Sequence, residues 1–149
     1  MTSSDNASLR RFIDAQRDHD SYAKALAELR QGRKRSHWIW FVLPQLRSLG
    51  HSWAADHYGI AGLAEARAYA DDPVLGPRLV ECVSAILEHR GTPARDILGG
   101  LDAMKLRSCL TLFSVAAPEA PEFAEALDAF FDGEPDQRTL DLLRERGEV

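Results

Sequence analysis

Apolar residues recur at intervals of three and four positions along most of the chain, which is the spacing of one face of an α-helix. The pattern is clearest over residues 79–87, which carry a strong amphipathic face. The sequence shows no strand-like alternation of apolar and polar residues and no internal repeat. We therefore predict an all-α fold, a single globular domain of eight or nine short helices over residues 1–149, with a polar, frayed start at residues 1–6.

Glycine and proline mark where these helices begin and end. Gly32, Gly59 and Gly133 each follow an apolar-periodic segment, the position at which helices commonly stop. Pro93 follows a threonine and suits the first position of a helix, and Asp136 is a typical N-terminal cap. We expect helices over about 8–17, 20–32, 52–58, 63–70, 77–91, 93–99, 101–116, 121–133 and from 136 onward.

The segment 37–46 departs from this pattern because residues 38–43 are apolar without a break. The run is far shorter than the roughly 20 residues that a membrane-spanning helix needs. Its periodicity does not distinguish a buried helix from a buried strand. Pro44 would end a helix at or before the preceding residue, and Ser36 would cap its start. We favour a short buried helix, with a strand as the alternative. Three aromatic residues are expected to anchor the core: Trp38, Trp40 and Phe41.

The segment 101–116 is apolar on nearly all sides, which predicts a central, buried helix. Lys105, Arg107 and Ser108 interrupt it, and buried charges are costly unless they are paired. One interpretation is structural, with the two basic chains reaching solvent or pairing with Asp102, Asp96 or Glu81. The other is that they line a site for an anion. Lys105 and Ser108, three residues apart, share a helix face, whereas Arg107 points elsewhere.

Composition narrows the class of protein. The chain is 45% hydrophobic and 28% charged, with a net charge of −5, as is ordinary for a soluble globular protein. The acidic balance makes nucleic-acid binding unlikely as a general role. The polar N-terminus lacks a secretory signal, so we expect a cytoplasmic protein with no membrane association.

The cysteines and histidines carry no recognised spacing for a metal or a cofactor. Cys82 and Cys109 lack a CxxC partner, and we interpret them as buried reduced thiols, with a disulfide or a catalytic thiol as alternatives. The five histidines form no HExxH or similar motif. We therefore expect no metal and no cofactor.

A basic run precedes the aromatic segment. Lys34, Arg35 and His37 stand beside Trp38 and Trp40, a combination that suits nucleotides because a base stacks while a phosphate meets a cation. The structural interpretation is a basic loop leading into a tryptophan-rich core. His37 is the candidate acid or base since histidine titrates near neutral pH, although a lone histidine next to a tryptophan is more often a hydrogen-bonded core residue. Gln45 would satisfy buried backbone or contact a ligand.

Taken together, these positions resemble the DUF1810 family of uncharacterised bacterial proteins over nearly the whole chain. The matching residues are Phe12, Ala15-Gln16, Tyr22, Ala25-Leu26, Glu28-Leu29, Gly32, Lys34, His37-Trp38, Trp40-Phe41, Pro44-Gln45-Leu46, Leu49-Gly50, Tyr58-Gly59-Ile60, Glu65-Ala66, Tyr69, Pro73-Val74-Leu75-Gly76, Arg78-Leu79, Asp102, Lys105-Leu106-Arg107-Ser108 and Thr111-Leu112-Phe113. The resemblance implies an all-helical single domain and brings no established activity. The label calpastatin, which some members have carried, finds no support in these residues. Cys109 departs from the family pattern, where serine is more common.

The leading hypothesis is a pocket between the segments 37–46 and 101–116 that binds an anionic small molecule, such as a nucleotide or a phosphorylated metabolite. His37 would be its acid or base, and the ligand-binding residues would be Lys34, Trp38, Trp40, Gln45, Lys105, Arg107 and Ser108. The alternative is a non-enzymatic protein-interaction module, in which the aromatics are core and the basic run 30–35 docks an acidic partner. Convergence of the candidate residues on one cleft would favour the pocket.

Overall fold

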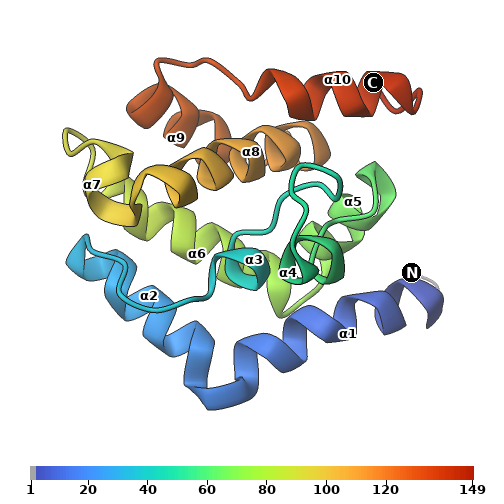
Figure 1. Ribbon diagram of the computed structural model, residues 1–149, viewed down its shortest axis with the longest axis horizontal. Coiled ribbons are helices and arrows are strands. Elements are labelled where there is room, and N and C mark those ends of the chain that lie inside the picture. Colours follow the sequence, from blue (N-terminus) through green and yellow to red (C-terminus); the bar gives the residue numbers. More distant parts are fainter. Residues whose placement is uncertain (1–2) are drawn as a thin grey trace.

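Every regular element in the part of the chain that the computed structural model describes, residues 3–149, is a helix (Figure 1). Side chains are described from Ser8 onward. A frayed start was expected at residues 1–6, of which residues 1–2 lie outside the described range and residues 3–6 belong to the first helix. The elements are α1 (Ser3–Arg17), a 3-10 turn (Asp18–Asp20), α2 (Ser21–Gln31), α3 (Ile39–Val42), α4 (Trp53–His57), α5 (Leu63–Asp71), α6 (Leu75–Leu87), α7 (Ala94–Leu98), α8 (Gly100–Ala116), α9 (Glu122–Phe131) and α10 (Gln137–Glu145). The prediction of an all-α fold is confirmed. None of the described helices is both long enough and apolar enough to cross a lipid bilayer.

Helix α8 lies at the centre of the molecule and packs against α5, α7, α9 and α10 (Figure 1). Its side chains Leu106, Leu110 and Phe113 are fully buried, as a helix that is apolar on nearly all sides requires. The prediction of a central buried helix is therefore confirmed. The exposed residues of this helix lie in its first turns, among them Leu101 and Met104.

The two cysteines lie in this core as free, buried thiols. Burial raises the pKa of Cys82 to about 12 and raises the pKa of Cys109 as well. A thiol must lose its proton to act as a nucleophile, so neither side chain is suited to that role. The interpretation as reduced core residues is confirmed.

The segment after α2 forms a tight turn followed by the single-turn helix α3, which ends before Pro44. A helix was favoured here, but its predicted cap is wrong. Trp38 occupies the N-cap position, and the Ser36 hydroxyl instead donates a hydrogen bond of 2.6 Å to Glu28. Trp38 is fully buried as expected, whereas Trp40 is only partly buried because one side of it faces the pocket described below.

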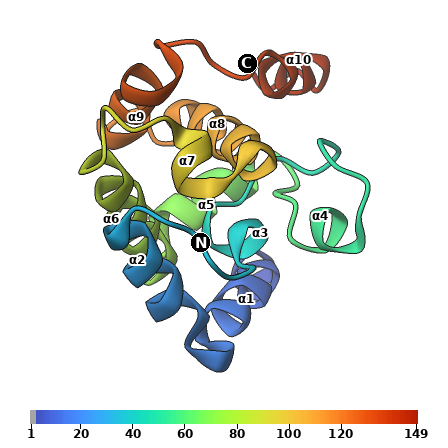
Figure 2. The same ribbon diagram turned by 60° about the vertical axis from the view of Figure 1, so that its left-hand side comes forward.

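After Pro44 the chain forms a loop over residues 46–60, here called the 46–60 loop, whose two ends are joined. The Ile60 N–H donates to the Gln45 carbonyl (2.9 Å) and the Arg47 N–H donates to the Ile60 carbonyl (2.8 Å), so Leu46 and Ile60 form an isolated parallel bridge. Gly59 is required there because a Cβ atom would lie 2.7 Å from the Arg47 Cα. The loop carries α4 and stands out on one side of the molecule (Figure 2).

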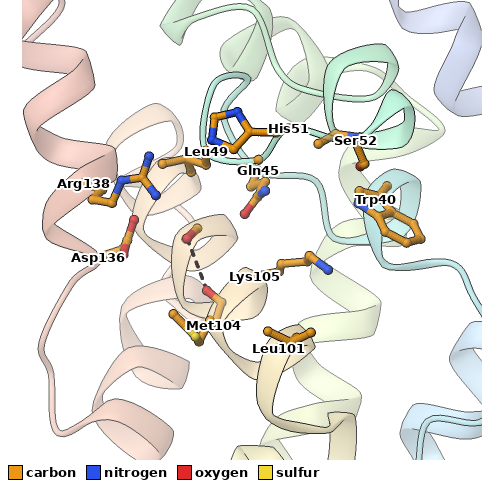
Figure 3. A pocket seen from close by; sticks show the side chains of 13 residues that line it. Trp40, Gln45, Leu49, His51, Ser52, Leu101, Met104, Lys105, Asp136 and Arg138 are labelled. Atoms are coloured by element: carbon orange, nitrogen blue, oxygen red, sulfur yellow. Dashed lines mark hydrogen bonds between the residues drawn. The ribbon is translucent and has the colours of Figure 1, made fainter.

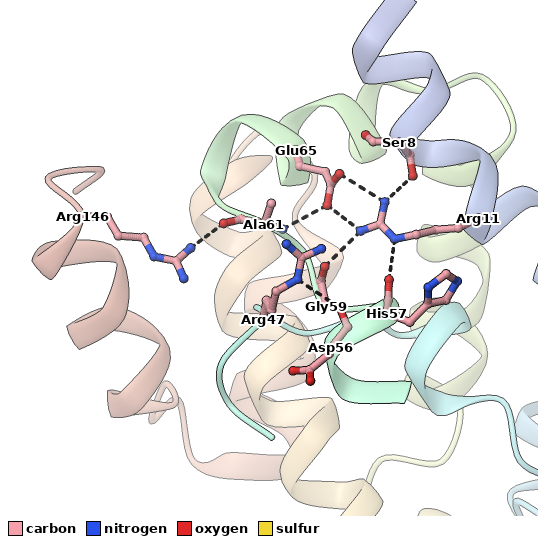
Figure 4. Close-up of polar contacts among 9 residues, drawn as sticks. All are labelled: Ser8, Arg11, Arg47, Asp56, His57, Gly59, Ala61, Glu65 and Arg146. Atoms are coloured by element: carbon pink, nitrogen blue, oxygen red, sulfur yellow. Dashed lines mark hydrogen bonds and ion pairs between the residues drawn. The ribbon is translucent and has the colours of Figure 1, made fainter. Parts of the chain in front are cut away.

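Arg11 of α1 holds the end of this loop in place (Figure 4). Its guanidinium donates to the carbonyls of His57 (2.7 Å) and Gly59 (3.0 Å). It also binds both carboxylate oxygens of Glu65 on α5, at 2.8 and 3.2 Å. Because the guanidinium is planar and bidentate, this contact fixes the loop relative to two helices at once.

Candidate ligand-binding site

A pocket of about 410 Å³ lies between the 46–60 loop, the first half of α8 and the start of α10 (Figure 3). This volume falls in the range of roughly 300–1,000 Å³ that is typical of small-molecule sites. Its apolar surface comes from Trp40, Leu49, Ala55, Leu101 and Met104. Leu101 and Met104 are 77% and 68% exposed, so the mouth of the pocket presents apolar side chains to solvent.

Lys105 lines the pocket and belongs to a group of three charges. Its ammonium is 3.2 Å from one oxygen of Asp102, and the ammonium of Lys34 is 3.0 Å from the other oxygen. The Lys34 side chain is only 8% exposed and also donates to the Ser36 carbonyl. Two lysines thus share one carboxylate, and this part of the pocket keeps a net positive charge.

Each lysine also lies over a tryptophan ring. The Lys34 ammonium is 5.1 Å from the centre of the Trp38 ring, and the Lys105 ammonium is 4.8 Å from that of Trp40. Such cation–π contacts are attractive because the ring face carries negative charge density. They fix the Lys105 ammonium at the edge of the pocket, next to the indole of Trp40.

The turn that carries Lys34 is held by Glu28 of α2. The Glu28 carboxylate accepts hydrogen bonds from the Arg35 and Ser36 N–H groups (2.7 and 3.0 Å) and from the Trp38 indole (2.9 Å). Burial alone would raise the pKa of Glu28, but these bonds and the Ser36 hydroxyl outweigh it and lower the pKa to about 2. Glu28 is therefore ionised at neutral pH and orders the residues behind the pocket.

Three polar side chains of the pocket have no partner among the described residues. Among the described residues, no hydrogen bond or ion pair involves the side chains of Gln45, His51 or Arg138, which all line the pocket. Asp136 is committed elsewhere, since its carboxylate caps α10 through the Thr139 N–H (3.0 Å) and hydroxyl (2.6 Å). The predicted cap at Asp136 is thereby confirmed. The one charged side chain of the pocket that has no partner in the described part of the chain, Arg138, is basic.

The structure brings some of the predicted ligand-binding residues together in the pocket. Four of the predicted binding residues line the pocket: Trp40, Gln45, Lys105 and Ser108. Ser108 shares the pocket face with Lys105, as their spacing predicted, although its hydroxyl donates to the Met104 carbonyl within α8 (3.2 Å). Lys34 and Trp38 lie behind the pocket and contact it through Asp102 and the aromatic segment.

Two predicted residues lie away from the pocket wall. Arg107 points to another side of α8, where its guanidinium donates to the Glu134 carbonyl (2.9 Å) and lies 5.8 Å from the centre of the Phe131 ring. The sequence predicted this divergence of Arg107 from Lys105. His37 is exposed and is not among the residues that line the pocket. The pocket gives His37 no role as acid or base.

Several lining residues were not predicted, and they come from segments far apart in the sequence. His51 and Ser52 belong to the 46–60 loop, and Arg138 belongs to α10. The sequence gives one weak sign of Leu101 and Met104. They are apolar residues in the first turns of α8, before its continuous apolar part begins. Nothing in the local sequence distinguishes Arg138 from other surface arginines.

The described residues offer no obvious metal site, since no group of three or more histidine, cysteine, aspartate or glutamate side chains gathers closely enough in this range. The pocket instead combines an apolar surface, unpaired basic groups and one free amide. This arrangement is suited to holding an organic anion.

The comparisons with known proteins agree with the resemblance noted in the sequence. The family model "Protein of unknown function (DUF1810)" matches residues 6–143. A crystal structure of the conserved hypothetical protein Rv1873 from Mycobacterium tuberculosis is 44% identical, covers 91% of this chain and 96% of its own, and superposes with a TM-score of 0.88. No curated protein matches the chain. With nearly its whole length matched, the chain belongs to the DUF1810 family.

Proposed function

We propose that the pocket binds an anionic small molecule that also carries an apolar or aromatic part. The observation that supports this most is the mismatch of its charges: Lys105 shares a single carboxylate with Lys34, and Arg138 forms no ion pair in the described part of the chain. An unpaired arginine, together with two lysines that share one carboxylate, favours a ligand that brings negative charge to this largely apolar pocket.

Two substitutions test this proposal. Arg138→Ala removes the unpaired guanidinium, and Lys105→Met removes the second cation while leaving Asp102 paired with Lys34 at 3.0 Å. Charged hydrogen bonds contribute about 1.5–3 kcal/mol each, so either change is expected to weaken binding of an anion by roughly 10- to 100-fold. The measurement is a thermal-shift screen with nucleotides, sugar phosphates and dicarboxylates, followed by calorimetric titration of each hit.

Arg144→Ala is the matched control. Arg144 lies on the same helix as Arg138, is 60% exposed, and among the described residues pairs with Asp141 alone, one turn earlier. Its removal changes the net charge by the same amount without touching the pocket. A hit whose affinity falls equally in the Arg138 and Arg144 variants binds through the overall charge of the protein and contradicts a specific site.

A protein-interaction module is the second candidate, and the exposed Leu101 and Met104 at the mouth of the pocket favour it. The basic run 30–35 supports it less, because Lys34 is buried and Arg30 is 3.6 Å from Glu81. Lys105 and Trp40 converge on the pocket while Arg107 does not. A screen without a single hit would favour the module.

A further inference from the structure

The feature that narrows the ligand class is the side chain of Gln45. Its backbone is fixed, since its carbonyl accepts from the Ile60 N–H at 2.9 Å and it follows the buried Pro44. Figure 3 shows its amide directed into the pocket, between Arg138 on one side of the view and Trp40 on the other. A partly buried amide on a fixed backbone, with no hydrogen-bond partner among the described residues, is available to bind a ligand group.

An amide presents a donor and an acceptor side by side in one plane. The complementary ligand group is a planar edge that carries an acceptor beside a donor, as nucleobases do, and glutamine binds adenine in this bidentate manner. Sugars carry hydroxyl groups, which do not form such a planar pair.

The surfaces around Gln45 suit a flat ring. Leu49 lies on one side, and Leu101 and Met104 form the exposed apolar mouth. A planar ring lying on these side chains would remove their apolar surface from water, and methionine sulfur contacts aromatic rings favourably. Arg138 and His51 lie toward the other end of the pocket in Figure 3, where an attached anion would meet them.

We infer that the ligand is a nucleoside phosphate, with its base edge bound by the Gln45 amide, its ring on Leu101 and Met104, and its phosphate at Arg138. This inference rests on the proposed function and adds the ligand class to it. The planar guanidinium of Arg138 fits two phosphate oxygens at once.

The first test needs no variant. The four ribonucleoside 5′-monophosphates and ribose 5-phosphate are titrated into the intact protein by calorimetry. At least one nucleotide is expected to bind roughly 10-fold or more tightly than ribose 5-phosphate, which has the phosphate without the base. If ribose 5-phosphate binds as tightly as all four nucleotides, the inference is overturned while the proposed function stands. If no anion in the wider screen binds, the proposed function itself fails.

The second test removes the amide. Gln45→Met keeps the length of the side chain and is expected to weaken the best nucleotide by roughly 10- to 100-fold, with the affinity for ribose 5-phosphate unchanged. Gln31→Met, at the exposed end of α2, is the matched control and is expected to change neither. Equal weakening of both ligands by Gln45→Met would assign the side chain a structural role and overturn the inference. Arg138→Ala is expected to weaken both ligands alike.

Discussion

Replacing Arg11 with methionine is expected to lower the free energy of unfolding by about 3–5 kcal/mol, the cost of removing one partner of a buried ion pair. The side chains of Arg11 and Glu65 are only 15% and 12% exposed, so Glu65 would keep its charge without the positive charge that balances it. The carbonyls of His57 and Gly59 would each lose a donor as well. Urea unfolding followed by circular dichroism measures the change.

The control for this prediction is Arg10→Met, one residue earlier on the same helix. Arg10 is 66% exposed and pairs with Asp14 across one helical turn, a contact worth about 1 kcal/mol or less. The two variants lose the same charge and gain the same side chain. Similar unfolding free energies for both would show that the Arg11–Glu65 contact contributes little to stability.

Replacing Glu28 with alanine has the second largest expected effect, a loss of about 2–4 kcal/mol of stability. Three N–H donors, on Arg35, Ser36 and Trp38, lose their acceptor at once. The Trp38 side chain is 1% exposed, so its indole N–H has no access to water as a replacement. The same change frees the turn that holds Lys34, and we expect anion binding to weaken along with stability.

The lowered pKa of Glu28 gives this prediction a pH signature. Because its pKa falls from 4.5 to about 2 on folding, ionised Glu28 stabilises the fold above pH 4.5, and this contribution is lost as the pH falls toward 2. Glu28→Gln keeps one carbonyl oxygen and does not titrate. The stability difference between the wild type and this variant is expected to narrow between about pH 5 and pH 2 in unfolding experiments. A constant difference across that range would contradict the role of Glu28 as an ionised acceptor.

The helices could be predicted from the sequence because their signals are local. Gly32 at the end of α2 and Asp136 at the start of α10 act within one turn of the chain. The predicted ends of the helices were less accurate where a side chain outside the helix, such as a neighbouring carboxylate, binds the terminal N–H groups. Helix α6 begins at Leu75 rather than at Pro77, because the Asp72 carboxylate accepts the Val74 and Leu75 N–H groups. The first helix begins at Ser3, about five residues earlier than the apolar pattern indicated.

The site could be predicted only in part, for a physical reason. Gln45 and Lys105 stand out because each breaks the pattern of its own segment, as an amide or a charge among apolar residues. Trp40 stands out as one of three aromatic residues in a short apolar run. Arg138 is an ordinary residue in its own helix, and its position in the pocket depends on how α10 packs against α8. Ser36 was wrongly predicted to cap the helix that follows it for the same reason: its actual partner, Glu28, lies eight residues away on another element.

Because the ends of the 46–60 loop are joined, the length and sequence of this loop can change with little effect on the rest of the fold. Hydrogen bonds at Ile60 close the loop at its base, so the number of residues between the ends has little influence on the helices beneath. Doubling the length of such a loop costs only about 0.6 kcal/mol in closure entropy. This loop supplies one wall of the pocket and α8 supplies another, so the two walls lie in separate stretches of the sequence. Insertions and exchanges within the loop would therefore change the shape of this wall of the pocket while the other wall, on α8, keeps its residues.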